Sequence, residues 1–369
     1  MKILIAGDFC PRDRVVTAFQ KEDYASVLKD VRELTVGTDY SIVNLECPVV
    51  TGAAKPIEKL GGNLCCTPHG VKALQYAGFK CVTLANNHFR DYGEEGVKET
   101  LATLKTQGFD YVGGGTNLYE AAQVLYKEIA GQRLAIVNCC EHEFSIATET
   151  SGGSNPLNPI QQYYAIREAK TQADFVLVIV HGGLEHWQLP LPRMVETYRF
   201  FIDAGADVVV NHHQHCYSGY EVYMGKPIFY GLGNFCFDKP QKHDGIWTEG
   251  YAVLIDFSMT VKFTLYPYRQ CAQEAKVELL SLEAFDKRIK ELNSVILVPE
   301  KLNKETHDYF IKGFGKYSTI FEPITNKHYL ALKQKGWLPS LISKQRKLTA
   351  ADFICCESHR DRLICFLNS

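Results

Sequence analysis

Short apolar runs alternate with amphipathic, helix-like segments over the first two-thirds of the chain. Seven of these runs are rich in Val and Ile and are typical of buried strands: KILIAG, YSIVNLE, FKCVTLAN, FDYVGG, RLAIVNCC, DFVLVIVHGG and ADVVVNHH. Between them, residues 67–77 and 93–107 have helical spacing, and Gly78 and Gly108 follow where C-terminal caps belong. This alternation predicts an α/β or layered α+β domain.

The pattern changes after residue 214 to closely spaced strand-like runs: CYSGYEVYM, KPIFYGLGNF, YAVLIDF and TVKFTLYPYR. A Met-Gly-Lys-Pro turn joins the first two, so we expect antiparallel hairpins that complete a sandwich. From about Leu282 onward the chain is Lys-rich and carries helical stretches such as SLEAFDKRIKELN. The sequence therefore predicts a layered domain over residues 1–281 and a helical C-terminal appendage over residues 282–369.

Composition excludes several classes of partner. The chain has 369 residues, 46% of them hydrophobic and 22% charged, and a formal charge of -2, which gives no global attraction to nucleic acid or anionic membranes. Its first residues suit a buried strand better than a signal peptide, and no run approaches the roughly 18 apolar residues of a spanning helix. We expect a cytoplasmic protein with no integral membrane segment. The 13 cysteines include no CxxC spacing and are expected to be reduced core thiols.

Polar side chains that can bind a metal or move a proton follow five of the predicted strands. In α/β sheets, ligands collect beyond the carboxyl ends of the strands, so these groups are expected to converge. In chain order they are Asp8; Asn44 and Glu46; Asn86, Asn87 and His88; His181 with Glu185 and His186; and Asn211, His212, His213 and His215.

Each of these residues also has a purely structural interpretation. Asp8 can cap the following turn, and an Asn such as Asn44 can bind loop backbone. Arg90 and Asp91 are expected to pair with each other on the helix-entry turn. Glu185 fits the role of a partner to a metal ligand as well as that of a ligand.

The joint pattern favours a metal. His213 and His215, spaced i, i+2 at an extended strand end, can aim both imidazoles into one site, an arrangement that Zn, Mn or Fe favours. Mixed nitrogen and oxygen ligands from several strands fit a hydrolytic centre better than a structural Cys site. We therefore expect a divalent transition metal, Mn, Fe or Zn, as one or two ions.

The ordered motifs resemble those of the CapA-like family of capsule-synthesis and poly-γ-glutamate-biosynthesis proteins, a branch of the calcineurin-like metallophosphoesterases. Between Gly7 and Asp238 they are GD, NLE, LANNHFRDYGEEG, GGGTN, VHGGLE, NHHQH and YGLGNFCFD. The resemblance implies a four-layered α/β/β/α sandwich with a C-terminal helical appendage. It also implies a metal-dependent hydrolase.

The resemblance further assigns roles to individual residues. It implies that Glu46 bridges two metals, and that Asn87 binds metal while His88 donates a proton to the leaving group. The implied metal ligands are Asp8, Glu46, Asn87, His181, His213 and His215. The implied partners of ligands or substrate are Asn44, Asn86, Glu185, His212 and Asn234.

Two departures from the family pattern bear on these roles. The wider superfamily has Asp-x-His where this chain has Asp8-Phe9-Cys10, so one metal lacks a ligand unless Cys10 or water substitutes, and a single-metal site stays open. Asn211 and Gln214 stand where the CapA-like pattern usually has Gly and Pro.

Two functions follow as alternatives. The first is a hydrolase of bacterial capsule or exopolymer biosynthesis, which cleaves a phosphoester or a related ester or amide bond in an anionic or polymer-derived small substrate. The second is a non-catalytic metal- or ligand-binding accessory of a polymer-synthesis complex. His88 favours the enzyme, whereas loss of Asp-x-His favours the accessory. We expect no nucleic-acid partner, because no basic groove with interleaved aromatic residues is visible.

Overall fold

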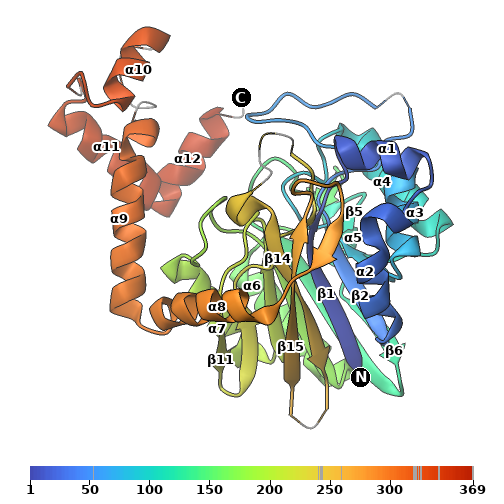
Figure 1. Cartoon of the computed structure of the whole chain (residues 1–369). Coiled ribbons are helices and arrows are strands. Elements are labelled where there is room, and N and C mark those ends of the chain that lie inside the picture. The colour runs from blue at the N-terminus through green and yellow to red at the C-terminus, as the bar shows by residue number, and fades with distance from the viewer. Residues whose placement is uncertain are drawn as a thin grey trace. The chain divides into compact units, whose positions relative to one another are not determined.

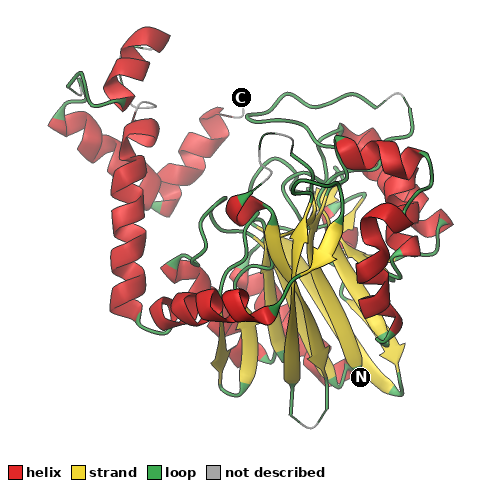
Figure 2. Ribbon diagram, in the orientation of Figure 1, coloured by secondary structure: helices red, strands yellow, loops and turns green. Residues whose placement is uncertain are grey.

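Two mixed β-sheets lie face to face in the first 280 residues (Figures 1 and 2). The structure, a computed structural model, describes residues 1–367 except residues 53, 240, 242–243, 259, 319–321, 323, 325 and 340. The first sheet has the order β16-β15-β14-β1-β2-β3-β4, with β13 also paired to β1. Its strands are β1 Lys2–Phe9, β2 Tyr40–Leu45, β3 Cys81–Thr83, β4 Asp110–Val112, β13 Asn234–Cys236, β14 Glu249–Asp256, β15 Lys262–Gln270 and β16 Val277–Leu279.

The second sheet has the order β11-β12-β10-β9-β7-β6. Its central strands β7, β9 and β10 run parallel, as β1 to β4 do in the first sheet. Its strands are β6 Leu125–Ile129, β7 Gln132–Cys140, β9 Phe175–His181, β10 Val208–His212, β11 Tyr220–Tyr223 and β12 Lys226–Phe229. A separate two-stranded sheet joins β5 Gly114–Gly115 to β8 Gly153–Ser154.

Helices cover both outer faces, which confirms the predicted four-layered sandwich. The outer face of the first sheet carries α1 Arg14–Gln20, α2 Ala25–Val36, α3 Pro68–Tyr76 and α4 Gly93–Thr106, whose apolar side chains share one core with β1 and β2. The outer face of the second sheet carries α6 Pro159–Gln172 and α7 Pro192–Ala204. The short α5 Leu118–Ala121 and a 3-10 turn at Gly245–Trp247 lie in connections.

Strand β1 shows why its sequence is apolar at nearly every position. Ile3 and Ile5 pack into the core between the sheets, whereas Leu4 and Ala6 pack against the helices outside. Side chains of a strand alternate between faces, so a strand buried on both faces reads as a continuous apolar run. Each such large aliphatic side chain contributes about 1.5–3 kcal/mol by burial.

The predicted hairpins are present, and they close different sheets. Strands β11 and β12 pair antiparallel at the edge of the second sheet, while β14 and β15 pair antiparallel in the first. The turn between β11 and β12 has positive φ at Met224 (50°) and Gly225 (77°), the signature of a type I′ hairpin turn.

The segment after residue 281 is helical in the described residues, as expected. Helix α8 (Leu282–Ile296) buries Phe285, Ile289 and Ile296 in the core that the two sheets share. The chain divides into two compact units, Met1–Leu302 and Asn303–Ser369. The domain boundary that the sequence predicts at Leu282 stays a prediction. The remaining helices are α9 Pro299–Ser318, α10 Lys327–Gln334, α11 Lys344–Cys355 and α12 Glu357–Leu367.

Among the described residues, no helix is both long enough and apolar enough to cross a bilayer.

Candidate metal centre

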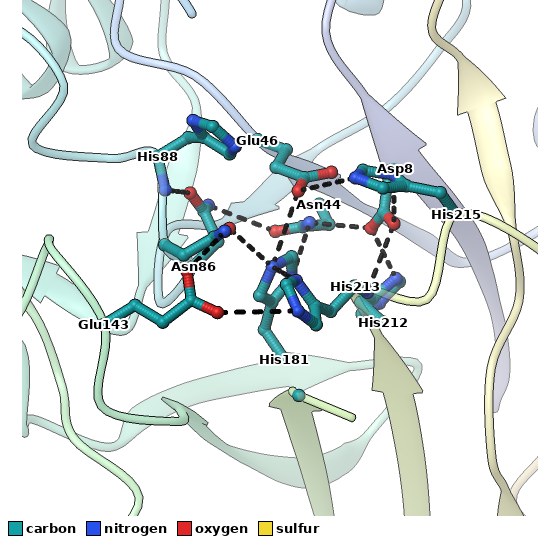
Figure 3. A network of polar contacts seen from close by, with 12 residues as sticks. Asp8, Asn44, Glu46, Asn86, His88, Glu143, His181, His212, His213 and His215 are labelled. Atoms are coloured by element: carbon teal, nitrogen blue, oxygen red, sulfur yellow. Dashed lines mark hydrogen bonds and ion pairs between the residues drawn. The ribbon is translucent and has the colours of Figure 1, made fainter. Parts of the chain in front are cut away.

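The parallel strands of both sheets end at one edge of the sandwich and carry the predicted polar residues there (Figure 3). In the first sheet, Asp8 on β1 lies in register with Asn44 on β2, and Glu46 follows β2 directly. In the second sheet, His181 on β9 is in register with His212 on β10. Residues far apart in sequence meet because parallel strands place their carboxyl ends together.

Two groups of ligand atoms meet at Glu46. The first ligand group is Asp8, Glu46 and His215, and the second is Glu46, His181 and His213; within each group the ligand atoms lie within 4.8 Å of one another. Glu46 Oε1 is 3.5 Å from His181 Nε2 and 3.7 Å from His215 Nε2. Glu46 therefore occupies the position of a bridging carboxylate.

The Glu46 carboxylate is fully buried, and neither oxygen accepts a hydrogen bond within the part of the chain that the structure describes. Burial raises the pKa of Glu46 well above its usual value, and the negative charge of Asp8 raises it further. Buried carboxylates are normally hydrogen-bonded or bound to a metal. An orphaned carboxylate that faces two imidazole nitrogens fits a cation between them.

The Asn87 amide lies against the second ligand group. Its Oδ1 is 3.0 Å from His181 Nε2, and His213 Nδ1 is 3.1 Å from the same atom. Burial lowers the pKa of His181 well below its usual value, and the charge of His213 lowers it further. His181 is therefore neutral near pH 7, which is the form that binds metals.

Buried partners hold the first ligand group. Burial raises the pKa of Asp8, but its contacts with histidines outweigh burial and lower the pKa overall. The largest of these effects comes from His212, whose Nδ1 lies 3.2 Å from Asp8 Oδ1. Asn44 Nδ2 also donates to Asp8 Oδ1 (2.8 Å). His215 Nδ1 lies 2.9 Å from Asn234 Oδ1, which leaves Nε2 for the site, and burial lowers the pKa of His215 to about 4.

The loop that carries the histidines is strained. His213 (φ 93°) and His215 (φ 54°) both lie in the left-handed region, at a cost of about 1–3 kcal/mol each. The two residues that depart from the family pattern anchor this loop through buried side chains. Asn211 bonds Tyr198, Gly182 and Tyr230, and Gln214 bonds the carbonyls of Trp187 and Leu189.

His88 lies beside the second ligand group without belonging to it. Its Nδ1 is 2.6 Å from Asp91 Oδ2, and Lys59 forms an ion pair with the other oxygen of Asp91. The expected Arg90–Asp91 pair is wrong, because Arg90 instead binds Glu94 (3.0 Å). Sequence reasoning missed Asp91 as the partner of His88, although its position three residues later in the same turn is a usable signal.

Two other predicted partner residues differ in their contacts: Asn86 hydrogen-bonds the backbone of its turn, whereas Glu185 is half-exposed. Asn86 braces the turn, since its Nδ2 donates to the Leu45 carbonyl (2.9 Å) and its Oδ1 accepts from the His88 amide (3.1 Å). Glu185 has a half-exposed side chain. Burial alone would raise the pKa of Glu185, but the charges of His215 and His213 lower it.

Glu143 is a site residue that sequence reasoning missed. Its Oε2 accepts a hydrogen bond from Asn87 Nδ2 (2.9 Å), and its Oε1 lies 3.6 Å from His213 Nε2 (Figure 3). It follows β7 in the segment EHE, directly after the apolar run RLAIVNCC. The strand-end rule that found the other residues therefore applied to Glu143 as well.

Cys10 is not a member of either ligand group. Its side chain is fully buried, and it hydrogen-bonds Cys47, whose thiol pKa is raised by burial and by its contacts with Cys10 and Cys66. Both Cys10 and Cys47 are free thiols. The first ligand group therefore has three donors from this chain.

Comparison with known sequences gives a consistent set of relatives. The profile of the family described as "Bacterial capsule synthesis protein PGA_cap" matches residues 2–239. The Capsule biosynthesis protein CapA of Bacillus anthracis is 36% identical over 221 residues, which cover 58% of this chain and 54% of that relative. The PGA biosynthesis protein CapA of Bacillus subtilis is 33% identical over 236 residues, or 63% and 62%. The chain thus spans less than two-thirds of the length of these relatives.

More distant likenesses extend this set. A probable polyglutamine synthesis accessory protein of Mycobacterium tuberculosis is 29% identical over 216 residues, which cover 53% of this chain and 55% of that protein. Among solved structures, a hypothetical protein from Thermus thermophilus superposes with a TM-score of 0.47 at 16% identity, covering 73% of this chain and 99% of that one. A 5′-nucleotidase precursor from the same organism has a TM-score of 0.42 at 11% identity, with 78% and 57% covered.

Proposed function

Because the chain belongs to the family of bacterial capsule synthesis proteins matched over residues 2–239, we propose that it is a metal-dependent hydrolase of capsule or exopolymer biosynthesis. Its substrate is an anionic or polymer-derived small molecule, with poly-γ-glutamate or a polysaccharide as the polymer. The bond cleaved is a phosphoester or a related ester or amide bond. The observation that carries the proposal is Glu46, a buried carboxylate without a hydrogen bond in the described chain that two sets of ligands share.

The donor set fits Mn, Fe or Zn, since imidazole, carboxylate and amide oxygen all bind these metals. One ion would be held by the first ligand group and another by the second ligand group with Asn87. When bound, such ions polarise a phosphoryl or carbonyl oxygen and lower the pKa of water. The protein contributes ligand orientation through buried contacts such as Asn234 to His215.

His88 supplies the proton for the leaving group. Its Nδ1 lies 2.6 Å from Asp91 Oδ2 and 3.2 Å from Lys59 Nζ, so Nε2 is the atom that can reach a substrate. The Asp91 carboxylate is buried and is itself held by Lys59 and by the amide of Leu64 (2.6 Å). This fixed contact orients the ring before substrate binds, which is what general acid catalysis requires.

A non-catalytic accessory role is the second candidate, and Cys10 is the observation that favours it. Cys10 stands where the superfamily has a histidine ligand, its thiol contacts Cys47, and it is in neither ligand group formed by the described residues. One relative is itself named as a probable accessory protein. In this role the chain would bind a metal or ligand within a polymer-synthesis complex and would turn nothing over.

Metal content measured beside turnover tests both candidates. The purified protein should contain Mn, Fe or Zn by elemental analysis. It should also hydrolyse at least one member of a panel of phosphomonoesters, phosphodiesters and γ-glutamyl amides. Bound metal without turnover on any member would favour the accessory role. No metal under any loading condition would contradict the hydrolase and would leave only an accessory that binds a ligand without metal.

A further inference from the structure

We propose that Glu143 is a positioning residue that fixes two ligands of the second ligand group in their metal-binding orientation. The inference rests on the proposed metal centre, and it gives a role to a residue that lies next to that centre and is not one of its proposed ligands. Glu143 lies in the loop after β7, outside both ligand groups, and about a third of its side chain is exposed.

The first contact sets the orientation of the Asn87 amide. An ionised carboxylate can only accept hydrogen bonds, so Glu143 Oε2 selects the NH2 end of the amide, at 2.9 Å. The carbonyl end of Asn87 is then turned inward, 3.0 Å from His181 Nε2. Without Glu143 the amide could rotate by half a turn and present a donor, which cannot bind a cation.

The second contact acts on His213. Glu143 Oε1 lies at ion-pair distance, 3.6 Å, from His213 Nε2, while Nδ1 of the same ring faces His181. The negative charge of a carboxylate near one ring nitrogen favours the proton on that nitrogen, which leaves the lone pair of the other nitrogen for a metal. One carboxylate thus orients two ligands, from different strands, of the same ion.

Other contacts hold the loop that carries Glu143, so its role is separable from loop folding. Ser145 Oγ accepts from the amide of Arg90 (3.0 Å), and the Ser145 carbonyl accepts from the amide of Ser154 (2.7 Å). Loss of the Glu143 carboxylate leaves both of these bonds in place. The loop should therefore keep its course in a Glu143 variant.

Titration of Mn2+ into the chelator-treated full-length protein tests the inference, with calorimetry for affinity and electron paramagnetic resonance for the number and pairing of ions. Glu143→Ala should weaken Mn2+ at the second ligand group about 10–100-fold and leave the first unchanged. The Mn2+ affinity of Glu143→Gln at the second ligand group should lie between those of wild type and Glu143→Ala, since the Gln amide accepts hydrogen bonds at one oxygen only. Glu149→Ala, an exposed position in the same segment, is the matched control and should bind as wild type.

Combined variants show where Glu143 acts. The loss of Mn2+ affinity in Glu143→Ala should be non-additive with that in Asn87→Ala, because both variants lose the same Glu143–Asn87 hydrogen bond. It should be additive with the loss in His215→Ala, which affects the first ligand group. Wild-type affinities in Glu143→Ala would overturn the inference and leave the metal centre standing. Equal weakening at both groups would also overturn it, because that result indicates a general loss of structure. A wild-type protein that binds no Mn2+ would contradict the metal centre and the inference together.

Discussion

The two sides of Glu46 differ in their access to solvent. On the side of the first ligand group, Asp8, its partner His212 and the His215 partner Asn234 are each at most 2% exposed. On the side of the second ligand group, the side chains of His88 and Glu143 are 13% and 35% exposed. The partners of the first ligand group are therefore buried, and we call this the sealed side, whereas the second ligand group has partly exposed neighbours, and we call this the open side.

The two sides also differ in charge. The first ligand group has two carboxylates and one imidazole, whereas the second has one carboxylate, two imidazoles and the Asn87 amide. A divalent cation is better neutralised by two carboxylates, so the first side should hold its ion more firmly. We infer that the sealed side anchors one cation and that the open side carries the chemistry.

Glu46→Gln should weaken metal binding at both ligand groups, because both groups lose the carboxylate that they share. We expect Mn2+ affinity at both groups to fall at least about 100-fold, beyond the usual effect of losing a neighbouring residue of a ligand. Hydrolytic activity should disappear with it. Elemental analysis of the purified variant measures the loss, and a variant that keeps either ion at full occupancy would show that Glu46 does not bridge.

The same variant has an opposite effect on the metal-free protein. In the metal-free protein, burial raises the pKa of Glu46, so folding costs free energy near pH 7, where the unfolded chain has this carboxylate ionised. Glu46→Gln removes that cost, so the chelator-treated variant should melt a few degrees above chelator-treated wild type. A lower melting temperature would mean that the carboxylate is satisfied without metal.

His88→Ala should lower turnover at the open side without changing metal binding at either side. General acid catalysis is typically worth about 10²–10⁴ in rate, so turnover should fall by that factor while metal content stays at the wild-type level. His307→Ala, at an exposed position on α9, is the control and should change neither. Unchanged turnover of a validated substrate in His88→Ala would remove its proposed role.

Asn234→Ala should weaken only the sealed side. Its Oδ1 fixes His215 through Nδ1, and losing such a partner typically costs 10–100-fold in metal affinity. Calorimetric titration with Mn2+ should show weakening at the first ligand group alone, the reverse of Glu143→Ala. Asn303→Ala on the exposed surface of α9 serves as control. Weakening confined to the second group would mean that the two sides are wrongly assigned.

Removal of residues 303–369 should have the smallest effect, because all ligands of both sides precede that segment. Metal stoichiometry should match that of the full chain. Ending the chain at residue 281 instead removes α8 and its buried Phe285, Ile289 and Ile296, so we expect a loss of several kcal/mol in unfolding free energy. Denaturant unfolding of both truncated proteins measures the difference. Metal loss from a folded 1–302 protein would extend the site into the C-terminal unit.

Most of the fold could be predicted because parallel, doubly buried strands leave a simple signal. The runs around Ile3 and Val209 are apolar at nearly every position, and the polar residues that end each run mark the edge where the site forms. The hairpins were also visible, but their assignment to different sheets was not. That assignment depends on which edge each hairpin meets in three dimensions.

The unpredicted parts of the site depend on contacts between loops. Lys59 reaches Asp91 from a long segment without periodicity, and Glu143 reaches Asn87 from the loop after β7. The segment that carries Lys59 has no hydrophobic pattern that fixes its course, whereas the strand end before Glu143 marks its position but not its contact with Asn87. The sequence of α8 likewise shows an apolar face, because the helix is amphipathic, but it does not show what covers that face.

The most direct test of a bridged centre at Glu46 is anomalous diffraction at the Mn edge from crystals of the full chain grown with Mn2+. Our account predicts two peaks that flank the Glu46 carboxylate, about 3.5–4 Å apart, one against Asp8 and His215 and the other against His181 and His213. Absence of any peak at ligand distance from Glu46, in crystals where the protein is otherwise ordered, would contradict it.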